Sequence, residues 1–378
     1  MIQPKRPVVL TIDDDDQNAT ELKLQKAVDV LARKPDEVTT ADLKKANVIL
    51  VDYQLEDWPG RQEVHSISLQ PGNGVALAAV LRSQVEEHIG DQRRAFAIHS
   101  GKLDELSGGL PALSREHAIA RTLNLEWVFS KRQNQKSPKL DVQVAALAGA
   151  VKALPRKWPE NPEKAQRFVS RLLATPPQQP WGSRAAADVE TCHPPIHEWA
   201  ASTHGMALLR WLLHQVLPYP SFLWEDRYLA ARLCVKVESL RQALASESKA
   251  RRVLEPLRYK GVLAEFLGDR WWRAGVEHML WEWTDGEPFN AVVVRDAVQA
   301  HVSKVLEPLK FNRPVVCVDP QSFRPLDQTI DVINAVEIKP DDWPAYAEQA
   351  WVHIDSTKDE GIAALVVPQD RHRIESAP

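Results

Sequence analysis

The chain has 378 residues, of which 44% are hydrophobic and 26% charged, and its net charge is −4. This composition is typical of a globular protein with two or three domains, and it excludes a disordered or fibrous chain. The acidic balance gives no global attraction to nucleic acid. Cys192, Cys234 and Cys317 are far apart and odd in number, so we expect no disulfide framework and a cytoplasmic location. No segment has the length and apolarity of a membrane span, so we expect no membrane partner.

Short apolar runs that stop at polar residues recur through the first third of the chain, a pattern typical of buried parallel strands. We predict strands at residues 8–12, 38–41, 48–52, 95–98 and 127–129. Helical patterns fall between them, at residues 17–33, 42–46, 74–89, 108–123 (a loop, then a helix) and 140–154. Because strands and helices alternate, we predict an α/β domain built on a doubly wound parallel sheet of five strands.

Composition changes along the chain predict four segments. We expect the five-stranded domain at residues 1–135 and a helical, Pro-rich linker at 136–188 that includes Pro176-Pro177-Gln178-Gln179-Pro180. A mostly helical, Trp-rich output domain follows at 189–310, with helices at 197–216 and 225–248. A small α+β tail completes the chain at 311–378, with strands at 315–318, 332–338, 350–354 and 363–367.

Polar side chains capable of phosphoryl chemistry follow four of the predicted strands. They are Asp13 and Asp14, Asp52, Ser100, and Lys131. Ligand chemistry in open α/β sheets takes place at the carboxyl ends of the strands. Carboxylates that converge there repel one another unless a cation joins them, and oxygen ligands select Mg²⁺. An aspartate can attack phosphorus, while a lysine stabilises the phosphoryl oxygens. These residues therefore predict a metal-assisted phosphoacceptor site. The alternative is that the carboxylates only cap helices.

In this order, five motifs resemble the receiver domain of two-component response regulators. They are Val9-Leu10-Thr11-Ile12-Asp13-Asp14, Val48-Ile49-Leu50-Val51-Asp52, Pro71-Gly72-Asn73-Gly74-Val75, Ala97-Ile98-His99-Ser100-Gly101 and Trp127-Val128-Phe129-Ser130-Lys131. The resemblance covers about the first 135 residues. It implies that Asp52 is the phosphoacceptor and that Asp13, Asp14, Asp52 and the backbone carbonyl of Gln54 hold Mg²⁺. It also implies that Ser100 is the switch hydroxyl, that Lys131 pairs with the phosphate, and that a histidine kinase or phosphotransfer protein is the donor.

The chain departs from the family pattern in several places. An insertion separates Asp52 from the turn at Pro71, and the segment between Ser100 and Lys131 is long. Arg132 stands where the family has a proline, and Val128 stands where it often has an aromatic residue. These departures leave the phosphorylation chemistry in place, but they put the usual signalling surface and dimerisation in question.

The C-terminal region is harder to interpret. Residues 227–245 have the spacing of a helix-turn-helix, but we expect an ordinary packed helix pair. The candidate DNA contacts are Arg241, Gln242, Lys249, Arg251 and Arg252. Cys192, His193, His197 and His204 are ligand types for zinc, yet we expect a plain turn there. For the segment Arg270-Trp271-Trp272-Arg273, with Trp281 and Trp283, we expect an aromatic core rather than a base-stacking surface.

The sequence thus predicts a response-regulator-like signalling protein that is phosphorylated on Asp52 and acts through a protein-interaction output region. We expect no enzymatic activity beyond this phosphorylation. Three alternatives stay open: a DNA-binding transcriptional regulator, an effector enzyme, and a phosphate-independent scaffold with a degenerate receiver.

Overall fold

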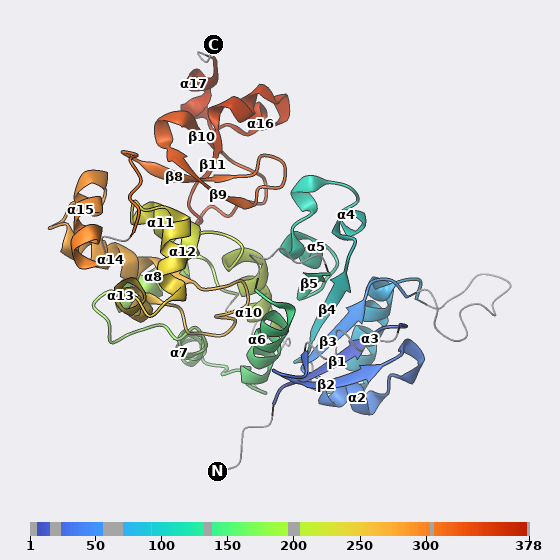
Figure 1. The fold of residues 1–378 in the computed structure, drawn as a ribbon. Helices are drawn as coiled ribbons and strands as arrows, with labels where there is room; N and C mark the ends of the chain where they lie inside the picture. Colours follow the sequence, from blue (N-terminus) through green and yellow to red (C-terminus); the bar gives the residue numbers. More distant parts are fainter. Residues whose placement is uncertain are drawn as a thin grey trace. The chain divides into compact units, whose positions relative to one another are not determined.

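The computed structural model describes residues 6–15, 24–55, 71–91, 93–131, 138–195, 205–302 and 306–375 (Figure 1). The chain divides into two compact units, both discontinuous in sequence. The first unit contains residues 1–173, 194–218 and 261–268, and the second contains residues 174–193, 219–260 and 269–378. Whether each of the four segments predicted from sequence folds independently stays a prediction.

The first unit is built on a five-stranded sheet in the order β2-β1-β3-β4-β5, and every pairing in it is parallel. Its strands are β1 (Val8–Ile12), β2 (Asp29–Arg33), β3 (Val48–Asp52), β4 (Ala95–Ser100) and β5 (Trp127–Ser130). This order, with the reversal beside the first strand, is that of a doubly wound α/β sheet. The predicted α/β class is therefore confirmed.

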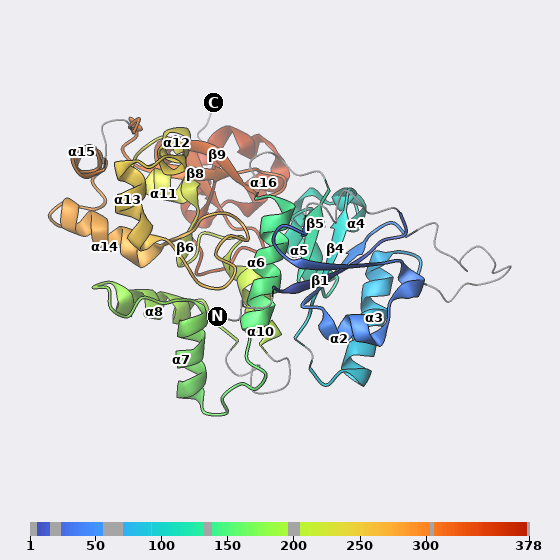
Figure 2. The same cartoon turned by 60° about the horizontal axis from the view of Figure 1, so that its bottom comes forward.

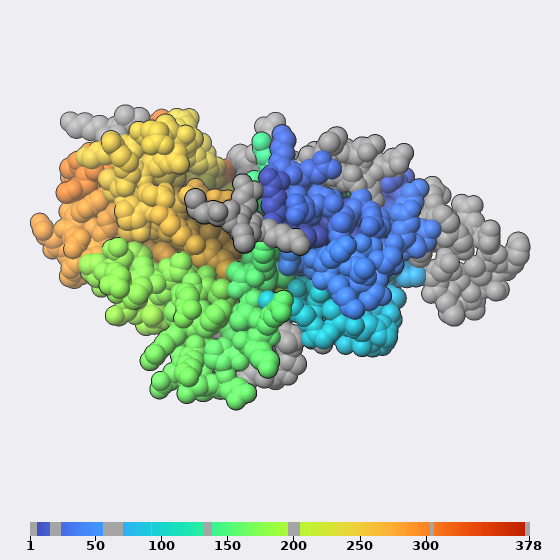
Figure 3. Space-filling model, turned by 90° about the horizontal axis from the view of Figure 1, so that it is seen from below, coloured from blue at the N-terminus to red at the C-terminus, as the bar shows by residue number. Residues whose placement is uncertain are grey.

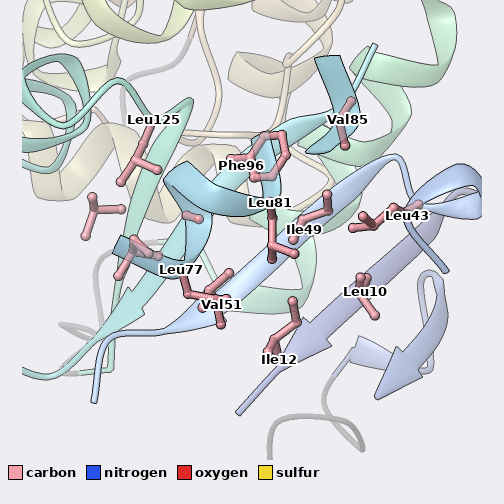
Figure 4. Close-up of a cluster of buried hydrophobic side chains, with 14 of the residues drawn as sticks. Leu10, Ile12, Leu43, Ile49, Val51, Leu77, Leu81, Val85, Phe96 and Leu125 are labelled. Atoms are coloured by element: carbon pink, nitrogen blue, oxygen red, sulfur yellow. The ribbon is translucent and has the colours of Figure 1, made fainter. Parts of the chain in front are cut away.

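Every residue of β3 and β4 is buried, which indicates that helices cover both faces of this sheet. Since side chains alternate between the two faces of a strand, Ile49 and Val51 share a face opposite to that of Val48 and Leu50. Figure 4 shows Ile49 and Val51 packed against Leu77 and Leu81 of α3 (Gly74–His88). The helix α6 (Leu140–Ala153) also packs against β3 and β4. Two-sided burial explains why these strands are continuous apolar runs.

The other helices in the described part of the first unit are shorter than α3 and α6. They are α2 (Thr40–Lys45), α4 (Leu103–Leu106), α5 (Glu116–Thr122), α7 (Pro162–Leu172) and α10 (Met206–Trp211), together with the 3₁₀ turns η1 (Pro35–Glu37) and η2 (Pro111–Leu113) and the π-helical η3 (Leu212–Val216). Leu43 of α2 joins the same core cluster as α3, and the two helices lie side by side (Figures 2 and 3).

Two predictions near the N-terminus are wrong. The predicted helix at residues 17–33 ends in strand β2 over Asp29–Arg33, while residues 17–23 lie outside the described part. The predicted strand at 38–41 is the start of α2. There the Thr39 hydroxyl accepts a hydrogen bond from the Asp42 N–H and Asp42 accepts one from the Thr39 N–H, a capping box that fixes the helix start.

A distant segment of the chain completes the core of the first unit. The ring of Phe266 contacts Trp127 edge-on at a centroid distance of 4.9 Å and Phe129 at 6.1 Å. The Gln143 side-chain amide of α6 donates a hydrogen bond of 3.0 Å to the Phe266 carbonyl. Trp127 and Phe129, which flank the predicted switch position Val128, are therefore core residues.

The second unit combines helices with a four-stranded sheet of order β10-β11-β8-β9, in which only the β11–β8 pair is parallel. The sheet strands are β8 (Pro314–Val318), β9 (Pro325–Asp331), β10 (Ala335–Ile338) and β11 (Ala350–His353), and a separate pair is formed by β6 (Leu223–Trp224) and β7 (Trp271–Trp272). The helices are α8 (Gly182–Thr191), α11 (Asp226–Arg232), α12 (Val237–Ala245), α13 (Lys249–Leu254), α14 (Arg273–Trp283), α15 (Ala291–His301), α16 (Glu360–Leu365) and α17 (Arg371–Glu375), with 3₁₀ turns η4 (Glu255–Leu257), η5 (Val332–Asn334), η6 (Ile354–Lys358) and η7 (Pro368–Asp370).

The predictions for this unit are partly correct. The strands expected at 315–318 and 350–354 are present as β8 and β11. The strand expected at 332–338 is present only over Ala335–Ile338, and η5 precedes it. The strand expected at 363–367 is wrong for its first part, because α16 occupies Glu360–Leu365, where the Asp359 side chain accepts a hydrogen bond from the Gly361 N–H. Its end does pair with β10, through an isolated antiparallel bridge between Val366 and Ile338. The strand β9 was not predicted.

The aromatic core prediction is confirmed for Trp271 and Trp272, each only 2% exposed, and it is wrong for Trp281, which is 56% exposed. Trp272 stacks on Phe222 at a centroid distance of 5.6 Å and also contacts Tyr259 and Trp181. Among the described helices, none has the length and apolarity that a membrane span requires.

Candidate functional site

The register of the parallel strands places the predicted site residues at one edge of the sheet. Ile12 pairs with Val51, so Asp13 and Asp52 each stand one residue farther along neighbouring strands. Asp52 pairs with His99, and on the next pair of strands Ser100 is level with Ser130. Lys131 follows Ser130, and its backbone N–H donates to the Ser100 carbonyl at 2.7 Å. The predicted convergence of these positions at the carboxyl ends of the strands is therefore present.

The Asp52 carboxylate is nearly enclosed, with 5% of the residue exposed. Its Oδ2 accepts a hydrogen bond of 3.0 Å from the backbone N–H of Gln54, and its Oδ1 forms an ion pair with the Lys131 ammonium. Burial raises the pKa of Asp52, and the contact with Lys131 opposes that increase. The Lys131 side chain is 43% exposed, so it has room to move toward an incoming anion.

Asp13 is strongly affected by its neighbours. Burial and the nearby charge of Asp52 raise the pKa of Asp13 to about 6, and Asp14 contributes in the same direction. The Asp13 carboxylate also accepts a 3.2 Å hydrogen bond from the backbone N–H of Asp15, which lowers its pKa. Asp14 raises the pKa of Asp52 as well. The three carboxylates therefore form a like-charge group whose repulsion a cation would relieve.

Ser100 and Gln54 lie beside this group. Ser100 is 1% exposed, and its hydroxyl oxygen accepts a 2.9 Å hydrogen bond from the backbone N–H of Lys102. Gln54 touches the site through its backbone N–H, the donor to Asp52. The insertion predicted after Asp52 falls mainly on residues 56–70, which lie outside the described part of the chain, as does Arg132.

The carboxylate group fits magnesium by its chemistry, although it is not a closed cage. In the described residues, no three His, Cys, Asp or Glu side chains are already arranged to hold a metal ion. Mg²⁺ is usually bound through only one or two carboxylates and keeps several waters. Burial raises the pKa of Asp13 most, and the charges of Asp52 and Asp14 add to the increase. The feature that favours a cation is the position of these carboxylates together at the ends of neighbouring strands. Asp13, Asp14 and Asp52 are the side chains that would hold it.

The turn before α3 packs closely against the backbone of Asp52 and Tyr53. The Asn73 side chain caps the helix by accepting a 3.0 Å hydrogen bond from the Ala76 N–H, and the Gly74 N–H donates to the Tyr53 carbonyl at 2.9 Å. A Cβ atom on Gly74 would lie 1.9 Å from the Asp52 carbonyl oxygen. Only glycine therefore lets α3 approach the backbone that carries the candidate phosphoacceptor.

No protein-family model matches this chain, and no curated protein matches it. What the chain does must therefore be argued from its own fold and from the geometry of the Asp52 site.

We expect Gly74→Ala to destabilise the protein by about 1–3 kcal/mol or more, because the added methyl group displaces the Asp52 backbone. Gly149→Ala in α6 is the matched control, since a Cβ there meets nothing within 4 Å. In a helix interior that change is expected to be neutral or stabilising by up to about 1 kcal/mol. Urea denaturation of both variants measures the difference, and equal stabilities would contradict the tight approach at Gly74.

The like-charge group predicts a pH effect. Asp13 has an ordinary pKa of 3.8 and a folded pKa of about 6, so between these values the folded state binds more protons than the unfolded state. Its contribution to stability therefore falls as the pH rises through this window. We expect Asp13→Asn to stabilise the metal-free protein by about 1–2 kcal/mol at neutral pH, a value reduced because Asp13 is partly exposed to solvent. Below pH 4 we expect no stabilisation, because Asp13 is then protonated in both states. Asp15→Asn, on the exposed neighbouring residue, is the control, and denaturation at both pH values is the measurement.

The other predicted sites are less well supported. Cys192 is 3% exposed, and burial raises the pKa of its thiol to about 12, which does not suit thiol catalysis. His197 and His204 lie outside the described residues. In the helix pair α11–α12, Cys234 adopts the left-handed conformation (φ 55°) in the turn. Arg241, one of the candidate DNA contacts, instead forms ion pairs with Asp226 at 2.6 Å and Asp327 at 2.9 Å.

Sequence reasoning missed a buried charge network at the opposite end of β5. Glu126 is fully buried, and its carboxylate pairs with Arg82 at 3.1 Å and with Arg210 at 2.7 Å. The backbone N–H of Phe96 donates to the same carboxylate. These contacts hold the pKa of Glu126 below its ordinary value despite burial, and they connect α10 to the sheet within the first unit. A glutamate between Leu125 and Trp127 gives no signal of these partners in the sequence.

Proposed function

We propose that the first unit is a receiver-like phosphoacceptor domain and that Asp52 accepts a phosphoryl group to control an output activity of the C-terminal region. The observation that carries the proposal is the arrangement at the sheet edge, where the nearly enclosed Asp52 contacts the Lys131 ammonium beside Asp13 and Asp14. A structural cap would need one carboxylate, whereas this edge holds three together at an electrostatic cost.

The chemistry follows from the positions of the side chains. A carboxylate oxygen of Asp52 attacks the phosphorus of the donor, the bond from phosphorus to the leaving group breaks, and the leaving group departs with the electron pair. The donor is the phosphohistidine of a kinase or phosphotransfer protein, or a small acyl phosphate. Lys131 must leave Asp52 Oδ1 and pair with the phosphoryl oxygens, a movement that its exposed side chain permits. Mg²⁺ bound by the carboxylates would neutralise charge on the transferring group.

Movement of the Ser100 hydroxyl could transmit phosphorylation of Asp52 to the rest of the domain. Its hydroxyl lies at the end of β4, and the Lys131 N–H donates to its carbonyl. A phosphoryl group on Asp52 offers new acceptor oxygens, which would draw the Ser100 hydroxyl and the Lys131 ammonium toward it. Such a shift changes the loops after β4 and β5. We propose that the output is a change in binding of a protein partner in the cytoplasm. The ion pairs of Arg241 support this choice, because they engage one of the candidate contact residues of the DNA-binding alternative.

The direct test is to incubate the full chain with acetyl phosphate, with and without Mg²⁺, and to measure the intact mass. We expect the mass of one phosphoryl group to be added only with Mg²⁺, and peptide mapping after borohydride reduction to place it on Asp52. Metal titration of the same sample should show that Mg²⁺ binds. If Mg²⁺ binds but neither acetyl phosphate nor a panel of phosphorylated kinases adds the mass, the domain is a receiver in fold only.

A further inference from the structure

The second unit contains a cavity of about 670 Å³ that the phosphoacceptor site does not involve. Its wall is formed by α11, α14, the start of α15, strand β8 and the segment 347–351. All of these belong to the second unit. The volume lies within the range of small-molecule binding sites, which is about 300–1,000 Å³.

The charged side chains that line this cavity have an excess of positive charge. The described lining contains three arginines and two glutamates, an excess of one positive charge. These residues are Arg232, Arg273, Arg313, Glu277 and Glu348. Both glutamates form ion pairs with Arg273, whose guanidinium is 2.9 Å from Glu277 and 3.6 Å from Glu348. No ion pair of Arg232 or Arg313 with another described side chain is found at 4.0 Å or less. Glu277 and Glu348 still act on Arg232 through their charge, so an anion would meet only the excess positive charge of the lining as a whole.

Hydrogen-bonding capacity at the cavity is also unused. Tyr228 is 6% exposed, and neither its hydroxyl nor the Nε–H of Arg232 has a hydrogen-bond partner among the described residues. Both residues line the cavity. Buried donors without a partner cost about 1–3 kcal/mol each, so their presence together in one wall calls for a functional reason.

Aromatic rings complete the lining. Phe289 lines the cavity but is 80% exposed, so it lies at the opening. The Arg232 guanidinium is 4.4 Å from the centroid of the Phe289 ring, and the Arg273 guanidinium is 5.7 Å from that of Trp224. Rings backed by arginine suit a flat apolar group that carries negative charge, because the ring contacts the walls while the anion meets the guanidinium.

From this combination we propose that the second unit binds a small anionic ligand, consisting of a carboxylate or phosphate attached to an aromatic ring, in this cavity. Arg232 and Tyr228 hold the anion after small side-chain movements, and the rings of Phe289 and Trp224 hold the apolar part. The site is separate from Asp52, so its test does not depend on phosphorylation.

Phenyl phosphate and benzoate are the probes, and they distinguish the two anion types. Benzylamine, which keeps the ring and reverses the charge, is the probe control. Calorimetric titration of the full chain should show saturable binding of at least one anion at millimolar concentration or below, and no comparable binding of benzylamine. If both anions fail to bind, or if benzylamine binds as well as they do, the proposal is wrong.

Variants test the residues. Arg232→Gln should weaken binding of the anionic probe about ten- to a hundredfold, because it removes a charge-assisted contact. Tyr228→Phe keeps the ring and should weaken binding about three- to tenfold. Arg251→Gln on α13, whose side chain is 44% exposed, is the matched control and should bind as the wild type does. Circular dichroism establishes folding, and Tyr228→Phe decides the result if Arg232→Gln does not fold. Unchanged affinity in folded Arg232→Gln or in Tyr228→Phe would overturn the assignment.

Discussion

Glu126→Ala is expected to destabilise the protein by about 3–5 kcal/mol, which is a large fraction of the stability of most domains. Glu126 is fully buried between Arg82 and Arg210, so its removal leaves two guanidinium groups partly buried without their counter-charge. The Phe96 N–H also loses its acceptor. Urea denaturation followed by circular dichroism measures the loss.

The matched control is Glu86→Ala on α3, an exposed glutamate, which is expected to change stability by no more than about 0.5 kcal/mol. Arg210→Gln should cost less than Glu126→Ala, since the Arg210 side chain is 32% exposed and is partly hydrated. If Glu126→Ala and Glu86→Ala are equally stable, the network contributes nothing and α10 is held to the sheet by apolar contacts alone.

Acidification should act on the same network. The pKa of Glu126 in the folded protein lies below its ordinary value of 4.5. The ionised carboxylate therefore contributes fully to the free energy of unfolding above pH 4.5, and this contribution is lost as the pH falls through the folded pKa. His214 accompanies it, with Nε2 3.0 Å from the Glu126 carbonyl, and burial lowers the pKa of His214 to about 4. Since the unfolded chain binds a proton on this histidine from pH 6.5 downward, His214 reduces stability as the pH falls from 6.5 to 4. Asp13 has the opposite sign in this range, so only comparison of variants separates the two.

The core of the first sheet could be predicted because burial on both faces leaves an unambiguous pattern. Strands β3 and β4 are continuous apolar runs, and polar residues mark their ends. Strand β2 was missed for the opposite reason: it lies at the edge of the sheet, only partly buried, and Asp29-Val30-Leu31-Ala32-Arg33 also fits the end of a helix. Residues 363–367 show the same ambiguity, since five apolar residues fit either a strand or a short helix.

The candidate site could be predicted for the residues that stand at the ends of strands. Asp13, Asp52, Ser100 and Lys131 each end or follow a strand, and parallel pairing brings strand ends to one edge. The Glu126 network was not predictable in this way, because Arg82 and Arg210 are 44 and 84 residues away in the chain. The capping box at Thr39 and Asp42 could have been found, since Thr-x-x-Asp resembles the usual signature of a helix start.

Asp52→Asn is expected to abolish phosphoryl labelling of the whole chain. The amide is close to the carboxylate in size but cannot attack phosphorus, and it loses the ion pair with Lys131. The variant should stay folded, since Asn can still accept the 3.0 Å hydrogen bond from the Gln54 N–H. Asp15→Asn, on an exposed residue near the site, should label as the wild type does. Labelling that persists in Asp52→Asn would mean that another residue is the acceptor.

Two further variants separate the roles of the neighbouring charges. Asp14→Ala should reduce labelling sharply and weaken Mg²⁺ binding in parallel, because it removes a carboxylate from the group that would hold the cation. Lys131→Ala should still be labelled, since the nucleophile and the metal-binding carboxylates are intact. Its phosphorylated form should, however, show a smaller structural response by hydrogen exchange near Ser100, because the ammonium that would move to the phosphoryl oxygens is gone. If Lys131→Ala is not labelled while its Mg²⁺ affinity is normal, the lysine acts in the transfer step itself rather than in the response to it.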